Sequence, residues 1–169
     1  MVFILDTDVL SNLRKEKKDP RVRSWVEQIG WPELSTTVIT VTELKCGIER
    51  QLPQHPDYAR RTQAWLDALL DVGGPRIYVL SVRAALILAT MHETPALRNF
   101  VVPDRRQKTP KTAADLAIAA IALAEGAVVA TGNASHFVEI SACFTLPGVY
   151  NPFKDQWVVT PSEAGHASL

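Results

Sequence analysis

Four polar side chains lie where predicted elements of this 169-residue chain meet, and their types suit one chemistry. Three are carboxylates and one is an amide: Asp6, Glu43, Asp115 and Asn133. Each follows a short apolar or β-branched run, or lies in the first turn of a predicted helix. Because the carboxyl ends of parallel strands meet at one edge of an open α/β sheet, we expect the four side chains to gather at that edge.

Three carboxylates that lie close together repel one another, and they stay ionised only when a cation lies among them. Oxygen ligands suit a hard ion such as Mg²⁺ or Mn²⁺. Such an ion activates water and neutralises charge on a reacting phosphate. The three acids therefore predict metal-dependent hydrolysis of a phosphate ester.

A purely structural interpretation of the same acids also fits the sequence. Thr40-x-x-Glu43 and Thr112-x-x-Asp115 both have the spacing of a helix capping box. The helix dipole alone favours an acid in the first turn. Asp8 is interpreted as the N-cap of the first helix or as an outer acid of the site.

The order of the predicted elements favours a three-layer α/β/α fold with a central parallel sheet of four to five strands. Apolar or β-branched runs predict strands at residues 2–5, 34–40, 77–80, 127–131 and 148–150. Helical patterns and their end signals predict helices at residues 9–18, 20–29, 40–50, 58–72, 81–93 and 112–126.

Composition excludes several classes of protein. Apolar residues make up 47% and charged residues 21%, which is typical of a globular chain and excludes disorder for most of it. The 18 basic and 18 acidic residues balance, so any contact with nucleic acid needs a local patch. Two distant cysteines without a C-x-x-C spacing argue against a zinc site. No signal-peptide pattern or long apolar run is present, and we expect a cytoplasmic protein.

Such a local basic patch lies in the predicted loop before Asp115. Its cations are Arg105, Arg106, Lys108 and Lys111. Beside a phosphate site they would bind a nucleic-acid backbone, and otherwise they form a solvated loop. Two further candidates lie later in the sequence. Thr131 is either an orienting hydroxyl or an ordinary strand-end residue, and His136 is either a substrate contact or an ordinary surface residue.

Four segments carry a resemblance to a known family. They are V-F-I-L-D-T-D-V-L-S-N-L-R (residues 2–14), T-V-T-E-L-K-C-G-I-E (40–49), D-L-A-I-A-A-I-A-L-A-E-G (115–126) and V-V-A-T-G-N-A-S-H-F (128–137). In this order the set resembles PIN-domain proteins, in particular the VapC and FitB ribonuclease toxins of bacterial type II toxin–antitoxin modules. The resemblance implies a PIN domain over residues 1–153, with a partly disordered tail over residues 154–169.

The resemblance also implies roles for the candidate residues. Asp6 and Asp115 would bind Mg²⁺ or Mn²⁺ directly, and Glu43 would complete the shell or orient the attacking water. Asn133 stands at the family's fourth acidic position, and it would hydrogen-bond to water or phosphate. Gly132 replaces an arginine of the family's T-R-N/D motif, and His136 replaces an acid of its later D-F pair. A neutral fourth ligand favours one firmly bound ion.

The implied function is a magnesium-dependent endoribonuclease toxin. The implied partners are RNA, a VapB-like antitoxin that places an arginine or lysine in the acidic cleft, and further copies of the chain. Two other interpretations stay open. Asp6-Thr7-Asp8 after an apolar strand is also the D-x-D pattern of haloacid-dehalogenase-like phosphatases, in which Asp6 would be the nucleophile. The second of these interpretations is a PIN-like binding module without catalytic activity, in which the acids serve only as helix caps.

Overall fold

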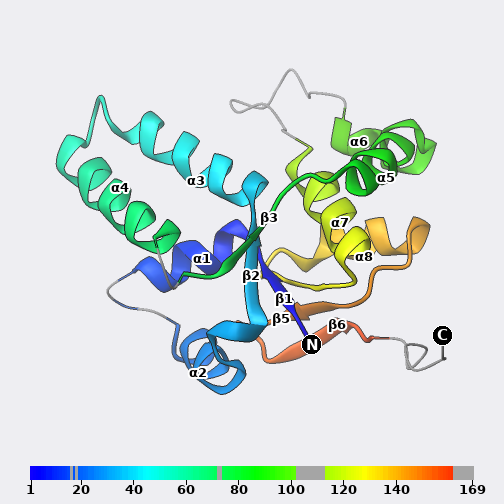
Figure 1. The fold of residues 1–169 in the computed structure, drawn as a ribbon, viewed down its shortest axis with the longest axis horizontal. Helices are drawn as coiled ribbons and strands as arrows, with labels where there is room; N and C mark the ends of the chain where they lie inside the picture. The colour runs from blue at the N-terminus through cyan, green and yellow to red at the C-terminus, as the bar shows by residue number, and fades with distance from the viewer. Residues whose placement is uncertain (16, 18, 72–73, 102–112, 162–169) are drawn as a thin grey trace.

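A central sheet of six strands organises the molecule, which we describe from a computed structural model (Figure 1). The structure describes residues 1–15, 17, 19–71, 74–101 and 113–161. The strand order is β3-β2-β1-β4-β5-β6, and only the β5–β6 pair is antiparallel. The strands are β1 (Phe3–Leu5), β2 (Leu34–Thr37), β3 (Arg76–Tyr78), β4 (Val128–Ala130), β5 (Val149–Asn151) and β6 (Gln156–Val159).

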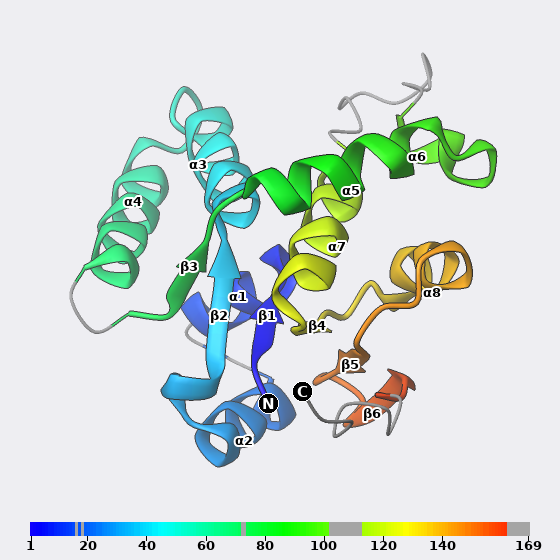
Figure 2. The ribbon, with the colours of Figure 1, turned by 45° about the vertical axis from the view of Figure 1, so that its right-hand side comes forward.

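Helices cover both faces of this sheet, as the sequence predicts. One set comprises α1 (Thr7–Arg14), α2 (Pro20–Ile29), α3 (Val38–Gln51) and α4 (Pro56–Leu70). The other comprises α5 (Val82–Glu93), α6 (Arg98–Val101), α7 (Ala114–Glu125) and α8 (Ala134–Cys143). Two short 3₁₀ helices, η1 (Trp31–Glu33) and η2 (Pro95–Leu97), complete the described elements. Figure 2 shows α5 and α7 side by side, with α3 and α4 on the other side of the sheet.

Alternating side chains of β1 divide the core between the two faces, because successive residues of a strand point to opposite sides. Phe3 and Leu5 pack in the cluster that contains apolar residues of α1 to α4. Ile4 packs in the cluster that contains α5, α7 and α8. Since β1 has parallel neighbours on both sides, its residues are fully buried, and the uninterrupted apolar run is the expected pattern.

Helix α7 holds one end of the candidate site in place. Its residues from Leu116 to Ala122 are buried, and it packs against α5, α3 and α8. Its C-cap is Gly126, whose φ of 65° lies in the left-handed region that glycine tolerates. Because α7 runs toward the start of β4, its first turn lies at the carboxyl ends of the strands (Figure 2).

The strand count differs from the expected four to five, because β6 lies within the segment predicted as a tail. It pairs with β5, with Trp157 opposite Tyr150 and their rings 5.2 Å apart. The Tyr150 hydroxyl donates a hydrogen bond to Asp155 in the connecting turn. Residues 156–159 alternate between exposed and partly buried positions, and they lack the uninterrupted apolar run by which the parallel strands were predicted. Helix α8, after the Gly132-Asn133 turn, also went unpredicted. No helix in the described ranges has the length and apolarity to cross a membrane.

Candidate active site

Asp6 lies at the carboxyl end of β1, between β2 and β4, as predicted. Its backbone N–H donates to the carbonyl of Ala130 (3.0 Å), which continues the β1–β4 ladder. The side chain is 7% exposed; Oδ1 accepts from the backbone N–H of Thr7 (2.6 Å) and Oδ2 from the Thr131 hydroxyl (2.8 Å). Asp6 is therefore the N-cap of α1, which corrects the assignment of that position to Asp8.

Burial, together with the charges of Asp8 and Asp115, raises the pKa of the Asp6 carboxyl to about 7. The hydrogen bonds from Thr131 and Thr7 act in the opposite direction but do not offset the burial. A carboxyl in this setting favours a proton or a cation beside it. This is the electrostatic environment that the sequence predicted for a metal ligand.

Asp8 lies in the first turn of α1. Its position in the sequence indicates an N-cap or an outer acid of the site, and the structure places it next to Gly132. Its Oδ2 accepts a hydrogen bond from the backbone N–H of Gly132 (2.8 Å). Its Oδ1 is buried and has no hydrogen-bond partner within the described part of the chain. Burial is the main cause of its raised pKa, and the charge of Asp115 contributes. The D-x-D spacing is the signal that the sequence offers; there it indicates a phosphatase motif, and Asp8 itself is interpreted as an N-cap or an outer acid of the site.

Asp115 lies in the first turn of α7, near enough to Asp6 and Asp8 for its charge to raise the pKa of both. The N-cap of α7 is Ala113, which has no capping oxygen in its side chain. Its φ of 51° is a left-handed conformation that is uncommon for alanine. The predicted capping box therefore does not account for Asp115, and Thr112 lies outside the described residues.

Glu43 lies in the second turn of α3, not in the first. The N-cap of this helix is Thr37, whose hydroxyl accepts from the backbone N–H of Thr40 (3.1 Å), so the Thr40–Glu43 capping box is wrong. Glu43 Oε2 instead accepts a hydrogen bond from the Thr7 hydroxyl (2.5 Å). Glu43 is thereby joined to the residue that follows Asp6.

Asn133 and His136 connect the loop after β4 to Asp115. His136 Nδ1 lies 2.6 Å from Asp115 Oδ2 and 3.3 Å from the Asn133 amide nitrogen. The Phe100 ring meets the imidazole edge to face, with centroids 5.3 Å apart. The imidazole thus occupies one carboxylate oxygen of a candidate metal ligand. The sequence marked His136 only as a minor substrate contact, because nothing in its spacing pointed to Asp115.

Gly132 is explained by close packing. A Cβ atom there would lie 2.6 Å from Asp8 Oδ2 and 2.9 Å from the Phe153 ring. We expect Gly132→Ala to destabilise the fold by about 1–3 kcal/mol, the usual cost of overpacking, as measured by urea unfolding. In Gly47→Ala, the matched control, the new Cβ meets nothing within 4 Å, so this variant should be neutral or stabilised by about 0.5–1 kcal/mol. Equal stability of Gly132→Ala and the parent would contradict this packing account.

The donor chemistry of the site fits a hard divalent ion. The charges of Asp8 and Asp115 raise the pKa of Asp6, and Asp8 supplies a buried oxygen without a partner among the described residues. In the described part of the chain, however, no group of three His, Cys, Asp or Glu side chains is arranged closely enough to hold a metal. Ion binding therefore requires side-chain rearrangement, for which the Asp115–His136 contact is the obvious place. The predicted RNA-binding residues Arg105, Arg106, Lys108 and Lys111 lie outside the described residues.

Comparison with known proteins identifies the family. The PIN domain family matches residues 3–141, and the chain belongs to this family, as predicted. Ribonuclease VapC14 of Mycobacterium tuberculosis (strain CDC 1551 / Oshkosh) is 33% identical over 70 residues, which are 40% of this chain and 65% of VapC14. The match thus spans just under two thirds of that relative's length.

Two solved structures share the fold over nearly their whole length. FitAcB from Neisseria gonorrhoeae has 24% sequence identity and a TM-score of 0.62, covering 90% of this chain and 99% of that chain. DNA-bound VapBC from Salmonella typhimurium has 21% identity and a TM-score of 0.63, covering 90% and 98%. At these identities the likeness establishes the fold.

Proposed function

We propose that this chain is a metal-dependent endoribonuclease and the toxin of a type II toxin–antitoxin module. The observation that carries the proposal is that Asp6, Asp8 and Asp115 lie near one another at the carboxyl ends of the strands, close enough for the charge of Asp115 to raise the pKa of both Asp6 and Asp8. Membership of the PIN family and the similarity to ribonuclease VapC14 support RNA as the substrate.

Asp6 and Asp115 are the proposed direct ligands of one Mg²⁺ or Mn²⁺ ion, and Asp8 is added to the ligand candidates on its unpartnered oxygen. When bound, such an ion would stabilise the negative charge that develops on the scissile phosphate. Thr131 and the Thr7 N–H fix the orientation of Asp6. A ligand fixed in this way needs little reorganisation when the ion binds.

Glu43 and Asn133 flank the three aspartates and act on substrate and water. Glu43 keeps one carboxylate oxygen beyond the one bonded to Thr7, and it is the proposed group that orients the attacking water. The Asn133 amide is exposed and lies at the start of α8, where it can donate to a phosphate oxygen. His136 holds one oxygen of the Asp115 carboxylate, and Asp115 would have to give up this contact if that oxygen were to bind an ion.

The phosphatase interpretation is set aside. The chain belongs to the PIN family over residues 3–141, which include the Asp6-Thr7-Asp8 pattern.

We expect RNA cleavage to stop in excess EDTA and to return when Mg²⁺ or Mn²⁺ is added beyond the chelator. The ion is needed because an array of ionised carboxylates would otherwise repel the phosphate backbone. The measurement is cleavage of a labelled RNA on a denaturing gel. A preparation with Asp115→Asn, purified identically, controls for contaminating nuclease. Cleavage by the parent chain at full rate in EDTA would refute the metal-dependent part of the proposal.

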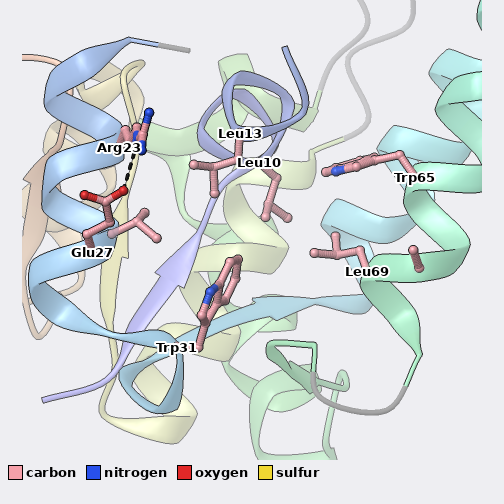
Figure 3. Close-up of a pocket in the computed structure, with 9 residues that line it drawn as sticks. Leu10, Leu13, Arg23, Glu27, Trp31, Trp65 and Leu69 are labelled. Carbon is pink, nitrogen blue, oxygen red and sulfur yellow. Dashed lines mark hydrogen bonds and ion pairs between the residues drawn. The ribbon is translucent and has the colours of Figure 1, made fainter. Parts of the chain in front are cut away.

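The proposed partner is a VapB-like antitoxin, and the fold offers an apolar surface for it. A pocket of about 620 Å³ lies between α1, α2, η1 and α4. Figure 3 shows Leu10 and Leu13 of α1 between Arg23 of α2 and Trp65 of α4, with the 3₁₀ residue Trp31 below them. Trp31 is 46% exposed, and burial of such a ring by an amphipathic helix would be favourable. A cationic side chain of the same segment is expected to reach Asp6 and Asp115.

A further inference from the structure

A second surface, next to the candidate active site, has the character of an anion-binding groove. It runs between α1, α3 and α4, and α3 packs against both of the other two helices (Figure 1). One hollow of about 290 Å³ includes Thr7 and Glu43 at one end and Arg14 and Tyr58 at the other. A second hollow, of about 430 Å³, shares Arg14 and Tyr58 and continues to Trp65. We call the combined surface the α1–α4 groove; its further lining includes Gly47, Arg50, Lys15 and Arg61.

Arg14, at the junction of the two hollows, is held in a fixed position. Its Nη2 donates to the Tyr58 hydroxyl (2.5 Å) and its Nη1 donates to the Thr62 hydroxyl (3.2 Å). The guanidinium carbon lies 5.0 Å from the centroid of the Tyr58 ring, in a cation–π contact. Both hydrogen bonds go to neutral oxygens, so the full positive charge is retained, and three N–H donors of the guanidinium stay available.

The cations of the groove differ from other cations of the same helices. Among the described residues, Arg14, Arg50 and Arg61 have no carboxylate within ion-pair distance. On the same helices but outside the groove, Arg60 pairs with Asp57 (2.5 Å) and Lys45 with Glu49 (2.5 Å). On α1, α3 and α4, the described arginines without an ion-pair partner therefore all line the groove, although the whole chain carries no net charge.

We propose that the α1–α4 groove binds a single-stranded RNA segment beside the scissile phosphate, with a backbone phosphate on Arg14 and a base stacked on Trp65. This assignment rests on the proposed function for its substrate class. A phosphate accepts two parallel hydrogen bonds from a guanidinium, and aromatic faces stack with bases of any sequence. Tyr58 acts as a positioning residue for Arg14. The groove begins at Glu43, so a strand lying in it passes directly to the candidate active site.

Binding without catalysis tests the proposal. Fluorescence anisotropy with a 5′-labelled oligouridylate of eight nucleotides, in EDTA, measures affinity whether or not the protein cleaves RNA. We expect Arg14→Gln and Arg61→Gln each to weaken binding about tenfold, the usual effect of one charge-assisted hydrogen bond. Each variant should also reduce the slope of log K against log salt concentration for oligouridylate binding by about the amount that one phosphate contact contributes. Arg61 is exposed and bonds to nothing in the described structure, so Arg61→Gln is informative even if Arg14→Gln unfolds.

Arg60→Gln is the matched control, because it removes the same charge from the same helix outside the groove. Its affinity should stay within about twofold of the parent. If Arg60→Gln and Arg61→Gln lose the same amount of oligouridylate affinity, the binding is non-specific attraction to positive charge and the groove proposal is wrong. An acidic peptide is the other occupant that a basic groove could take. Binding of an octaglutamate probe that needs Arg14, together with RNA binding that does not, would also overturn the proposal.

Gly47 offers an independent test by obstruction. A Cβ at this helical glycine meets nothing within 4 Å, so a side chain can project into the groove without moving the fold. Gly47→Leu should weaken oligouridylate binding at least about fivefold with thermal stability equal to or above the parent, since leucine favours the helix. Gly47→Ala should bind normally. If the parent protein does not cleave RNA but its oligouridylate binding still depends on the groove residues, the proposed function is refuted and the groove proposal is not. If Gly47→Leu binds oligouridylate with the affinity of the parent, the groove proposal is refuted.

Discussion

Asp115→Asn is expected to lose RNA cleavage by a factor on the order of 100 or more while the protein stays folded. The Lewis-acid effect of an ion on a phosphate is worth several kcal/mol, and each 1.36 kcal/mol changes a rate about tenfold. Stability should change little, because the helix-dipole contribution of about 0.3–1 kcal/mol is opposed by relief of repulsion with Asp6 and Asp8. The readouts are cleavage of labelled RNA and growth arrest on expression.

The control for this variant is Glu125→Gln, at the other end of α7. It removes one acid from the same helix far from the strand ends, and its cleavage rate should equal that of the parent. Glu43→Gln should follow Asp115→Asn, and Asn133→Ala should be milder because no charge is lost. An Asp115→Asn protein that melts earlier but still cleaves RNA and stops growth would show that Asp115 only supports the helix.

The second large effect is on the pH dependence of stability without metal. The pKa of Asp6 rises from 3.8 to about 7 on folding, so the folded chain keeps a proton that the unfolded chain releases. The stability that this group contributes is fully present below about pH 4 and is lost as the pH rises through 7. The loss is at most about 4 kcal/mol, at about 1.36 kcal/mol per unit of pKa. The raised pKa of Asp8 acts in the same direction.

Asp6→Asn should remove most of this loss, as urea unfolding at pH 5 and pH 8 in EDTA would measure. The amide fits the site, since its oxygen can accept from the Thr7 N–H and its nitrogen can donate to the Thr131 hydroxyl. Asp57→Asn, an exposed acid of α4, should keep the parent's pH dependence. If Asp6→Asn and the parent lose the same stability between the two pH values, the burial of Asp6 is not the cause.

Much of the architecture follows from local patterns. The uninterrupted apolar run of β1 predicted a buried parallel strand, and the structure places this strand between β2 and β4. An acid directly after a buried strand has few purely structural explanations, which is why Asp6 was a candidate site residue. The helix Pro20–Ile29 begins at its proline as predicted. Membership of the PIN family was recognisable because four segments occur in a fixed order, although each alone is weak.

The parts that the sequence did not predict depend on contacts between distant segments. Asp8 joins the candidate site through a hydrogen bond from Gly132, which lies 124 positions away, and no local pattern encodes that pairing. His136 reaches Asp115 only through the packing of α8 against α7. Strand β6 is stabilised by ring contacts of Trp157 with Tyr150 and Phe3, which a four-residue segment cannot reveal.

Anomalous diffraction from crystals of the protein soaked in Mn²⁺ tests the central claim most directly. If Asp6 and Asp115 are the ligands, the strongest manganese peak will lie between their carboxylates, with oxygen distances of about 2.1–2.2 Å. We expect the Asp115–His136 contact to open in the same crystals, and we expect no peak in Asp115→Asn crystals soaked identically. A parent crystal with no manganese between Asp6 and Asp115, grown from protein that cleaves RNA in the same Mn²⁺ buffer, would contradict the account.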